Sequence, residues 1–149
     1  MKTTDFMAMA FDEARAAAER GEVPVGAVVV DRLGRVLARA GNRVEEDNDP
    51  SAHAEMLVIR DACFVVGEPR IPDCDLYVTL EPCAMCAQVI SAARVRRLYF
   101  GAYDPKSGGV EHGAKVFDHA TCHHAPEVYG GINESDAAQL LKDFFAERR

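Results

Sequence analysis

The spacing of apolar residues changes several times along the chain, and each change marks an expected element of secondary structure. Four stretches either repeat apolar residues at three- and four-residue steps or open on a capping signal, which is typical of helices. Five shorter runs are rich in β-branched or aromatic residues, as strands are. The expected helices are residues 5–20, 49–66, 81–92 and 133 onward, and the expected strands are residues 25–31, 36–40, 75–80, 97–102 and 127–129.

The order of these elements predicts the fold class. Residues 31–35 join the first two strands as a hairpin, and the strand, helix and strand of residues 75–102 form a right-handed parallel crossover. Asp49 as the cap and Pro50 as the first helical residue open the second helix. We therefore expect an α/β protein, a three-layer α/β/α sandwich with a mixed sheet of about five strands and helices on both faces. Internal repeats and linker-like tracts are absent from the sequence, so residues 1–149 are expected to form a single domain.

Two further stretches carry expectations of their own. The segment 103–126 is rich in Gly and His and lacks periodicity, and loops of that length are usually functional or mobile. In the last helix we expect Phe144 and Phe145 to be core residues, followed by Arg148 and Arg149 as a solvated end.

Composition and charge narrow the function classes. Lys and Arg number 17 and Asp and Glu number 24, so the 149-residue chain has a net charge of −7 with neutral histidines. That balance argues against a protein that coats nucleic acid or anionic membranes through bulk electrostatics. Hydrophobic residues make up 48%, which excludes a disordered chain, and no window holds the roughly 18 apolar residues of a membrane span. Asp5, Asp12 and Glu13 interrupt any signal peptide, and five cysteines fit a reducing, cytoplasmic setting with free thiols.

Two short motifs carry the candidate chemistry, His53-Ala54-Glu55 and Pro82-Cys83-Ala84-Met85-Cys86, and each lies at an expected helix start. Cys83 and Cys86 are one helical turn apart, so both sulfur atoms can bind one ion, and a helix N-terminus favours their thiolate form. His53, in the first turn of the other helix, supplies a third ligand. Three protein ligands leave one tetrahedral position open, which is the pattern of a catalytic zinc site rather than a structural one.

Glu55 indicates the function of the open coordination position of the zinc ion. It lies two residues after His53, about 200° around the helix, so it can lie beside the metal without binding it in the same way. Zinc lowers the pKa of a bound water molecule towards about 7, and a nearby carboxylate can accept the proton and pass it on. We therefore expect Glu55 to be the catalytic proton shuttle, a role that contributes roughly 10²–10⁴-fold to turnover.

The pair of motifs, H-x-E followed by P-C-x-x-C, is the known signature of zinc nucleobase deaminases. Within that superfamily the chain resembles the bacterial tRNA-specific adenosine deaminases over nearly its whole length. The resembling segments are residues 22–28, 41–43, 49–55, 77–86, 100–108 and 144–149. The motif pair assigns the superfamily, while the flanks of the cysteines and the loop Asp104-Pro105-Lys106-Ser107-Gly108 narrow the resemblance to this family.

The resemblance implies a cytidine-deaminase-like fold and a reaction. It implies that His53, Cys83 and Cys86 bind one zinc ion per subunit and that Glu55 is the proton shuttle. The implied reaction is hydrolytic deamination of adenosine to inosine, with release of ammonia, in the anticodon loop of a tRNA at the wobble position. Glu55 would protonate N1 of the flipped adenine and then assist the departure of ammonia. Single-stranded loop bases cost least to extrude, which suits an anticodon stem-loop as the partner.

The resemblance also implies the substrate contacts and the assembly. Asn42 matches the asparagine that touches the flipped base, Ala54 supplies a backbone contact to that base, and Asp104 belongs to the loop that meets the neighbouring nucleotide. A homodimer is implied, with a second subunit that helps to form the RNA groove. The sequence ends with Arg148 and Arg149, whereas some relatives carry a longer basic tail.

Two other functions stay open on the sequence. The first is a deaminase of free guanine or cytosine, which would share every zinc residue and need no RNA groove. The second is a non-catalytic, zinc-stabilised RNA-binding module, which requires a closed four-ligand site that includes Cys74 or another thiol. The place of Cys74, before a strand and after Pro72-Asp73, favours a free thiol instead, and Cys63 is expected in the core.

The remaining histidines and the net charge carry weaker expectations. His112, His119, His123 and His124 lack the spacing of metal ligands and are expected to be loop residues, some of them near RNA. The acidic excess implies weak overall binding of RNA, with the substrate selected by the fit of its pocket. Zinc, the helix N-termini and Lys106 would supply positive charge where the substrate needs it.

Overall fold

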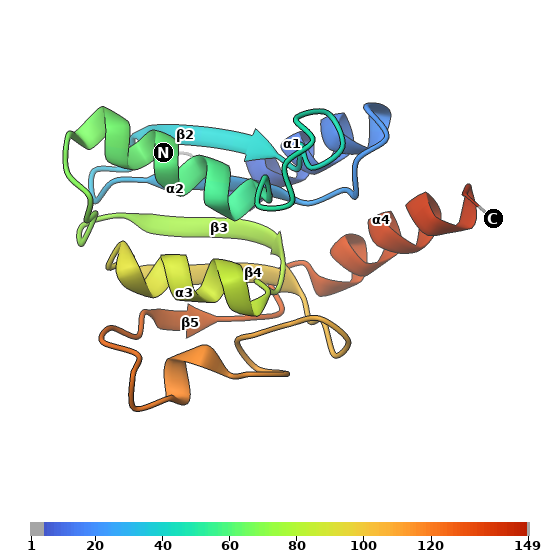
Figure 1. Cartoon of the computed structure of the whole chain (residues 1–149). Coiled ribbons are helices and arrows are strands. Elements are labelled where there is room, and N and C mark those ends of the chain that lie inside the picture. The colour runs from blue at the N-terminus through green and yellow to red at the C-terminus, as the bar shows by residue number, and fades with distance from the viewer. Residues whose placement is uncertain (1–4, 149) are drawn as a thin grey trace.

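The sheet of this computed structural model, which describes residues 5–148, has its five strands in the order β2-β1-β3-β4-β5 (Figure 1). β1 runs antiparallel to both β2 and β3, while β3, β4 and β5 run parallel to one another. The sheet is therefore mixed, as the sequence predicts. The strands are β1 Gly26–Val30, β2 Val36–Gly41, β3 Asp75–Leu80, β4 Arg97–Ala102 and β5 Glu127–Tyr129.

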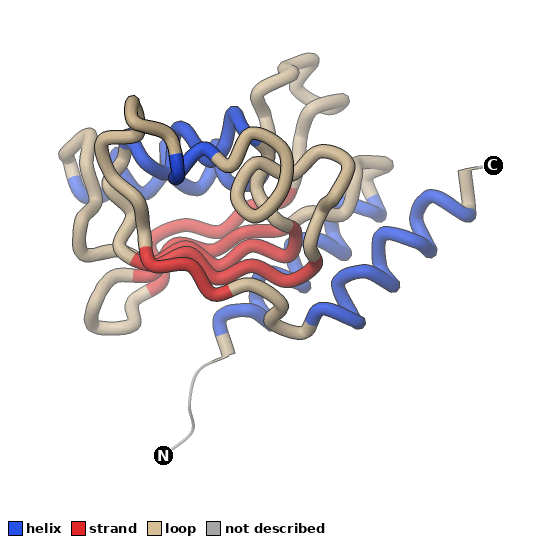
Figure 2. The backbone as a smooth tube through the Cα atoms, turned by 90° about the horizontal axis from the view of Figure 1, so that it is seen from below, coloured by secondary structure: helices blue, strands red, loops and turns tan. Residues whose placement is uncertain are grey.

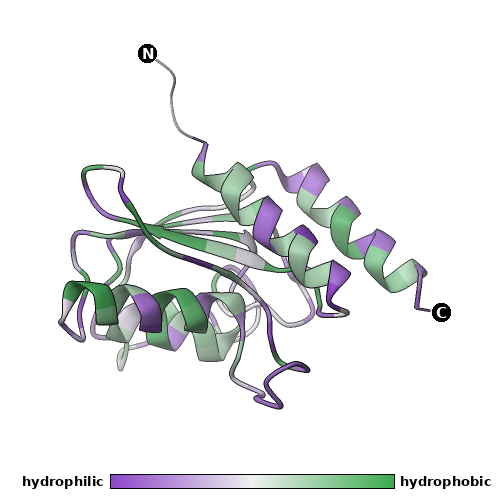
Figure 3. Ribbon diagram, turned by 90° about the horizontal axis from the view of Figure 1, so that it is seen from above, coloured by the Kyte–Doolittle hydropathy of each residue, from purple (hydrophilic) through white to green (hydrophobic). Residues whose placement is uncertain are grey.

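Helices cover both faces of the sheet (Figure 2). α2 and α3 lie on one face, and α1 and α4 lie side by side on the other (Figure 3). The predicted three-layer α/β/α sandwich is confirmed. Across residues 5–148, none of the helices is long and apolar enough to cross a membrane. The helices are α1 Phe6–Glu19, α2 Ala54–Val66, α3 Ala84–Ala92 and α4 Glu134–Ala146, with a short 3₁₀ helix η1 at Val116–Asp118.

The interior strand β1 contributes side chains to two separate hydrophobic cores. Ala27 and Val29 belong to the core beneath α2 and α3, whereas Val28 and Val30 belong to the core beneath α1 and α4. All residues of β1 are buried because helices cover both faces, which explains its continuous apolar run. On the first of these faces, α2 and α3 both begin at the end of the sheet where β3 ends (Figure 1). Two helix N-termini therefore meet at one edge of the sheet.

The second helix begins later than the sequence predicts. The prediction that Asp49 and Pro50 open it is wrong, because α2 begins at Ala54 and His53 stands before it in an extended conformation. The Asp49 carboxylate instead accepts hydrogen bonds from the N–H and the hydroxyl of Ser51, at 2.8 and 2.7 Å. These bonds close a local turn, which is the usual competitor of a helix cap for an aspartate.

The third helix also begins later, at Ala84 rather than at Pro82, with Cys83 extended before it. The Pro82 carbonyl accepts the N–H of Gly109, at 2.8 Å, and so faces a loop rather than the helix. The Cys83 carbonyl accepts the first helical hydrogen bond, from Ala87 at 2.8 Å. Cys83 therefore stands at the N-cap position of α3, as His53 does at that of α2.

The last helix buries one side only. Phe144 is 6% exposed, as predicted, but Phe145 is 50% exposed and the core prediction is wrong for it. Ala137 and Phe144 are two full turns apart and share the buried side, whereas Phe145 points about 100° away from Phe144. Cys63 of α2 is partly buried against the core, in agreement with its expected place.

Candidate metal centre and active-site pocket

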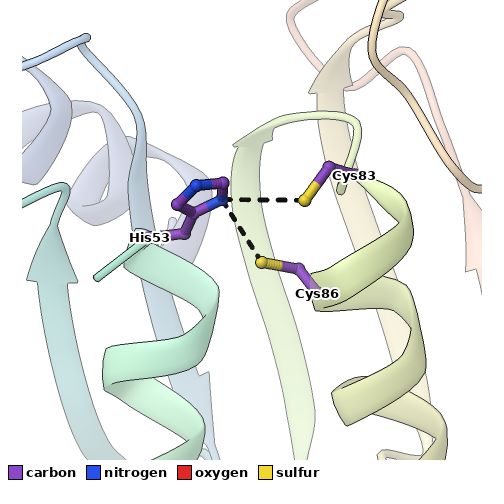
Figure 4. Close-up of side chains that lie close together, drawn as sticks. All are labelled: His53, Cys83 and Cys86. Carbon is purple, nitrogen blue, oxygen red and sulfur yellow. Dashed lines mark hydrogen bonds between the residues drawn. The ribbon is translucent and has the colours of Figure 1, made fainter. Parts of the chain in front are cut away.

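Three side chains, His53, Cys83 and Cys86, converge from two neighbouring helices at one end of the sheet (Figure 4). His53 is the last residue before α2 and Cys83 the last before α3, and both have extended backbones, with ψ of 149° and 173°. Cys86 lies in the first turn of α3. All three side chains are thus held at helix N-termini, where the helix dipole stabilises thiolates.

The distances fit a tetrahedral zinc ion. The Nδ1 atom of His53 lies 3.6 Å from the Sγ atoms of Cys83 and Cys86. Zinc bond lengths of about 2.3 Å to sulfur and about 2.0–2.1 Å to nitrogen place tetrahedral N and S ligands roughly 3.5–3.6 Å apart. The three ligand atoms lie within 4.8 Å of one another, and no fourth His, Cys, Asp or Glu from residues 5–148 joins them. One coordination position is therefore left for water or substrate.

The protonation of the ligands should make cation binding depend on pH. The pKa of Cys83 is lowered to about 4, first because the Cys86 thiol donates a hydrogen bond to its sulfur and also because His53 lies beside it. The same hydrogen bond, together with burial, raises the pKa of Cys86. The hydrogen bond with Cys83 raises the pKa of His53. A metal ion must displace the protons on Cys86 and His53, so metal affinity should rise with pH.

Glu55, the predicted proton shuttle, is buried beside the ligands. It is 4% exposed and lines the same pocket as His53 and Cys83. Burial raises its pKa to about 7, although its own backbone N–H donates a hydrogen bond to the carboxylate. The expectation that His53 and Glu55 lie about 200° apart on one helix is wrong. His53 precedes α2, and only Glu55 belongs to it. Both side chains therefore reach one pocket.

A pocket of about 570 Å³ opens beside the ligands. Asn42 and Asp104, two of the predicted substrate contacts, line it from the segments that follow β2 and β4. Ala54 does not line it, because the residue is fully buried and its N–H donates to Oδ1 of Asn42 at 2.8 Å. Arg148 is exposed, as expected, but it also lines the pocket, and its guanidinium lies 3.6 Å from the ring centre of Phe144.

Known proteins that resemble this chain identify its family. The sequence profile of the cytidine and deoxycytidylate deaminase zinc-binding region matches residues 1–102, a stretch that includes the three ligands and Glu55. The chain belongs to this deaminase family. It is 60% identical to the tRNA-specific adenosine deaminase of Agrobacterium fabrum, over 98% of this chain and 95% of that protein.

Solved structures of deaminases share the fold. One, from work on tRNA deaminases that carry out A-to-I editing at the wobble position of transfer RNA, has a TM-score of 0.89 and 60% identity, and covers 91% of this chain and 98% of its own. A guanine deaminase of Bacillus subtilis has a TM-score of 0.66 and 30% identity, and covers 99% of this chain and 94% of its own. The expected cytidine-deaminase-like fold is confirmed.

The deaminase site is not closed by a fourth cysteine. Cys74 is a free, buried thiol next to the start of β3, whereas Cys83 and Cys86 follow the end of that strand. Burial is the first cause that raises the pKa of Cys74 to about 11, so it stays protonated at neutral pH. The alternative of a structural zinc site completed by Cys74 is wrong, because Cys74 does not join the group of His53, Cys83 and Cys86.

The histidines of segment 103–126 lie outside the metal site, as predicted. Nδ1 of His112 lies 2.8 Å from Oε1 of Glu81. His119 and His124 each bond a backbone carbonyl, and His123 is exposed. The bonds of His112, His119 and His124 hold the loop in place, and among residues 5–148 none of the four histidines joins the group of His53, Cys83 and Cys86.

Two buried glutamates in the wall of the pocket were not predicted from the sequence. Glu22 is 2% exposed and accepts hydrogen bonds from the backbone N–H groups of Glu45 and Glu46, at 3.1 and 2.8 Å. Glu81, also 2% exposed, binds the segment that follows β4 in the same way. No local signal marks them, because the first partner of each lies 23 residues later in the chain.

Proposed function

We propose that this deaminase converts adenosine to inosine in the anticodon loop of tRNA, at the wobble position. The observation that carries the proposal is a single pocket that joins a three-ligand metal site, a buried carboxyl group and two polar side chains from opposite loops. Such a pocket suits a flat, extruded base that reacts at one ring carbon. The 60% identity to a tRNA-specific adenosine deaminase favours adenosine in RNA over a free base. In this proposal residues 1–149 act as one catalytic domain.

The chemistry of the pocket follows from its residues. His53, Cys83 and Cys86 would hold one zinc ion, which when bound supplies the Lewis acidity that brings the pKa of water near 7. Glu55 accepts a proton from the attacking water and delivers it to N1 of the adenine, which makes C6 more electrophilic. It then passes the second proton to the departing amino group, so that adenosine and water yield inosine and ammonia. A carboxyl group whose burial raises its pKa to about 7 can hold and release a proton at neutral pH.

Asn42 is placed to orient the base. Its Oδ1 accepts the N–H of Ala54 at 2.8 Å, which leaves its amide NH₂ group to donate to a ring nitrogen of the substrate. Its own backbone N–H donates to the carbonyl of Val25 at 3.1 Å, and its carbonyl accepts from the Arg20 guanidinium at 3.0 Å. Asn42 is thus fixed before the substrate arrives. The N–H of Ala54 would contact the base only if it donated to the base and to Oδ1 of Asn42 at the same time.

A second hollow continues from the pocket and favours an RNA strand over a free base. It has a volume of about 1010 Å³ and shares Asp104 and Arg148 with the first pocket. Lys106, Lys142 and the exposed ring of Phe145 also line it. Cationic groups suit phosphates, and an exposed aromatic ring suits an unstacked base. Local positive charge thus coexists with the net charge of −7.

We further propose that the deaminase works as a homodimer in the cytoplasm and that the second subunit helps to form the RNA groove. The resemblance to the tRNA-specific adenosine deaminases supports the dimer, and five free cysteines support a reducing compartment. Sedimentation velocity of the purified protein tests the assembly. A fully active monomer would contradict it.

The experiment that tests the reaction compares substrates. Zinc-loaded protein is incubated with an anticodon stem-loop that carries adenosine at the wobble position, with a stem-loop whose adenosine lies elsewhere in the loop, and with free guanine and cytosine. We expect inosine at the wobble position only. Ammonia release from guanine or cytosine without RNA deamination would establish the second candidate, which the 30% identity to a guanine deaminase supports.

A further inference from the structure

Glu81 stands between two parts of the proposed active site. Its side chain is fully buried, directly after β3 and before Pro82. Its backbone N–H donates to the carbonyl of Ala102 at 2.8 Å, which extends the pairing of β3 with β4. A buried carboxylate is strongly unfavourable unless other groups replace its water, so the partners of Glu81 decide its role.

Every hydrogen-bond partner of the Glu81 carboxylate comes from one loop, residues 104–112. Oε1 accepts the N–H of Asp104 at 3.0 Å and the Nδ1–H of His112 at 2.8 Å. Oε2 accepts the N–H groups of Val110, Glu111 and His112, at 3.2, 2.9 and 3.0 Å. These bonds use the roughly four acceptor positions of a carboxylate and leave none for a substrate. The same carboxylate therefore holds both ends of the loop.

The loop also lies against the turn that carries Cys83. The N–H of Gly109 donates to the carbonyl of Pro82 at 2.8 Å. A Cβ atom on Gly109 would collide with the backbone at Cys83, so the two backbones touch there. At the other end of the loop, Asp104 lines the pocket. One loop thus joins a metal ligand to the substrate wall.

We propose that Glu81 is a positioning residue that sets the separation between the metal centre and the substrate loop 104–112. Glu81 also lines the pocket, but its carboxylate has no acceptor position left for a substrate, so it acts through this loop. The proposal rests on the proposed function, because the loop is a substrate wall only if the pocket binds the base. Loss of the charge on Glu81 should free the loop and weaken substrate binding, while α2 and α3 keep the three metal ligands in place.

The test compares Glu81→Gln with Glu127→Gln, a matched control. Glu127 is an exposed residue of β5 that bonds Arg97 and Tyr129 and lies outside the pocket. For Glu81→Gln we expect KM for the wobble stem-loop to rise at least roughly tenfold, the factor of one lost hydrogen bond to a charged group, with a smaller change in kcat. Amide hydrogen exchange should accelerate at residues 104–112 and not in α2 or α3, and zinc content should not change. Glu127→Gln should alter none of these.

Three results would overturn the proposal. The first is wild-type KM together with wild-type exchange at residues 104–112. The second is a loss of kcat at unchanged KM, which would make Glu81 a catalytic residue. The third is a lower Tm at unchanged KM, which would make its role purely structural. If the wild-type protein does not deaminate the stem-loop, the proposed function fails, and the exchange at residues 104–112 still decides whether Glu81 holds the loop.

His112→Ala provides a second variant, which removes one of the five hydrogen bonds and keeps the carboxylate. The His112 side chain is 35% exposed, so this variant should fold even where Glu81→Gln does not. We expect a smaller acceleration of amide hydrogen exchange at residues 104–112 and a KM increase of roughly two- to tenfold. Exchange and KM equal to those of the wild-type protein would count against the proposal.

Discussion

Glu55 and Glu81 are both buried near the turn that carries Cys83, but their pKa values are shifted in opposite directions. Glu55 is 4% exposed, and burial raises its pKa to about 7 because few donors replace the lost water. Burial also pushes the pKa of Glu81 upward, but the hydrogen bonds from Asp104, His112 and the adjacent backbone outweigh it and lower the pKa. The supply of donors, rather than burial, thus decides whether a buried carboxyl group keeps a proton. The region around Glu55 is suited to proton transfer, and the region around Glu81 to holding a loop.

The largest expected effect comes from Glu55→Gln, which keeps the shape of the side chain and removes its acid–base function. We expect the single-turnover rate of inosine formation to fall by at least roughly 100-fold. Zinc content, measured by atomic emission, should stay at one ion per chain because no ligand changes. A variant that keeps a rate near that of the wild-type protein would show that another group carries the proton.

The next effect concerns the stability of the metal-free protein. The pKa of Glu55 is about 7 in the folded state and near 4.5 otherwise, so the folded state binds an extra proton between these pH values. The free energy of unfolding should therefore fall as pH rises through this window, by at most about 3 kcal/mol, and Glu55→Gln should lack that loss. Urea unfolding with a chelator at about pH 5 and about pH 8 measures it. An equal difference between the two proteins at both pH values would mean that Glu55 does not titrate there.

Glu81 should show the opposite dependence. Its pKa is lowered in the folded state, so its stabilisation is complete above the ordinary glutamate pKa and is lost as pH falls through the lowered value. At neutral pH we expect Glu81→Gln to reduce the free energy of unfolding by about 2 kcal/mol, because buried N–H groups lose their acceptor. The same urea series, extended into acid, should show this difference shrink. A difference that is constant with pH would mean that the charge of Glu81 does not stabilise the loop.

The smallest effect is expected at Cys74, which is as buried as either glutamate but has no place in the site. Cys74→Ser should leave zinc content and kcat unchanged and lower the free energy of unfolding by about 1 kcal/mol, the cost of a buried hydroxyl with imperfect partners. Zinc analysis and a thermal melt are sufficient to check it. Loss of zinc from this variant would instead support the alternative of a closed four-ligand site that includes Cys74.

Features with a local signal could be predicted from the sequence. β3, β4 and β5 have the predicted bounds, because charged residues, proline or glycine border each apolar run. The ligands were recognisable because a Cys-x-x-Cys pair at a helix start needs no distant contact to bring its sulfur atoms together. The start of α2 was mispredicted because an aspartate such as Asp49 is typical of both a helix cap and a local turn. Here it forms a turn with Ser51.

The two buried glutamates of the pocket wall, Glu22 and Glu81, could not be predicted, because their partners lie far along the chain. Glu81 bonds a loop that begins 23 residues later, and Glu22 bonds Glu45, also 23 residues later. Nothing in the neighbouring sequence separates such a glutamate from a solvated one. The exposure of Phe145 has a similar cause, since only the docking of α4 on β4 decides which of two adjacent aromatic rings is buried.

The hydrogen bond between Asn42 and Ala54 constrains how this enzyme could evolve. The N–H of Ala54 is the first of α2, one of the four that a helix cannot satisfy internally, and the N-cap residue His53 gives it no side-chain acceptor. The amide of Asn42 therefore caps the very helix that aims a metal ligand. If Asn42 orients the base as we propose, a substitution of Asn42 that favours another base would also remove this cap, at a cost of about 1 kcal/mol. New base selectivity at this position would therefore carry this loss of stability unless a second substitution supplies a replacement cap.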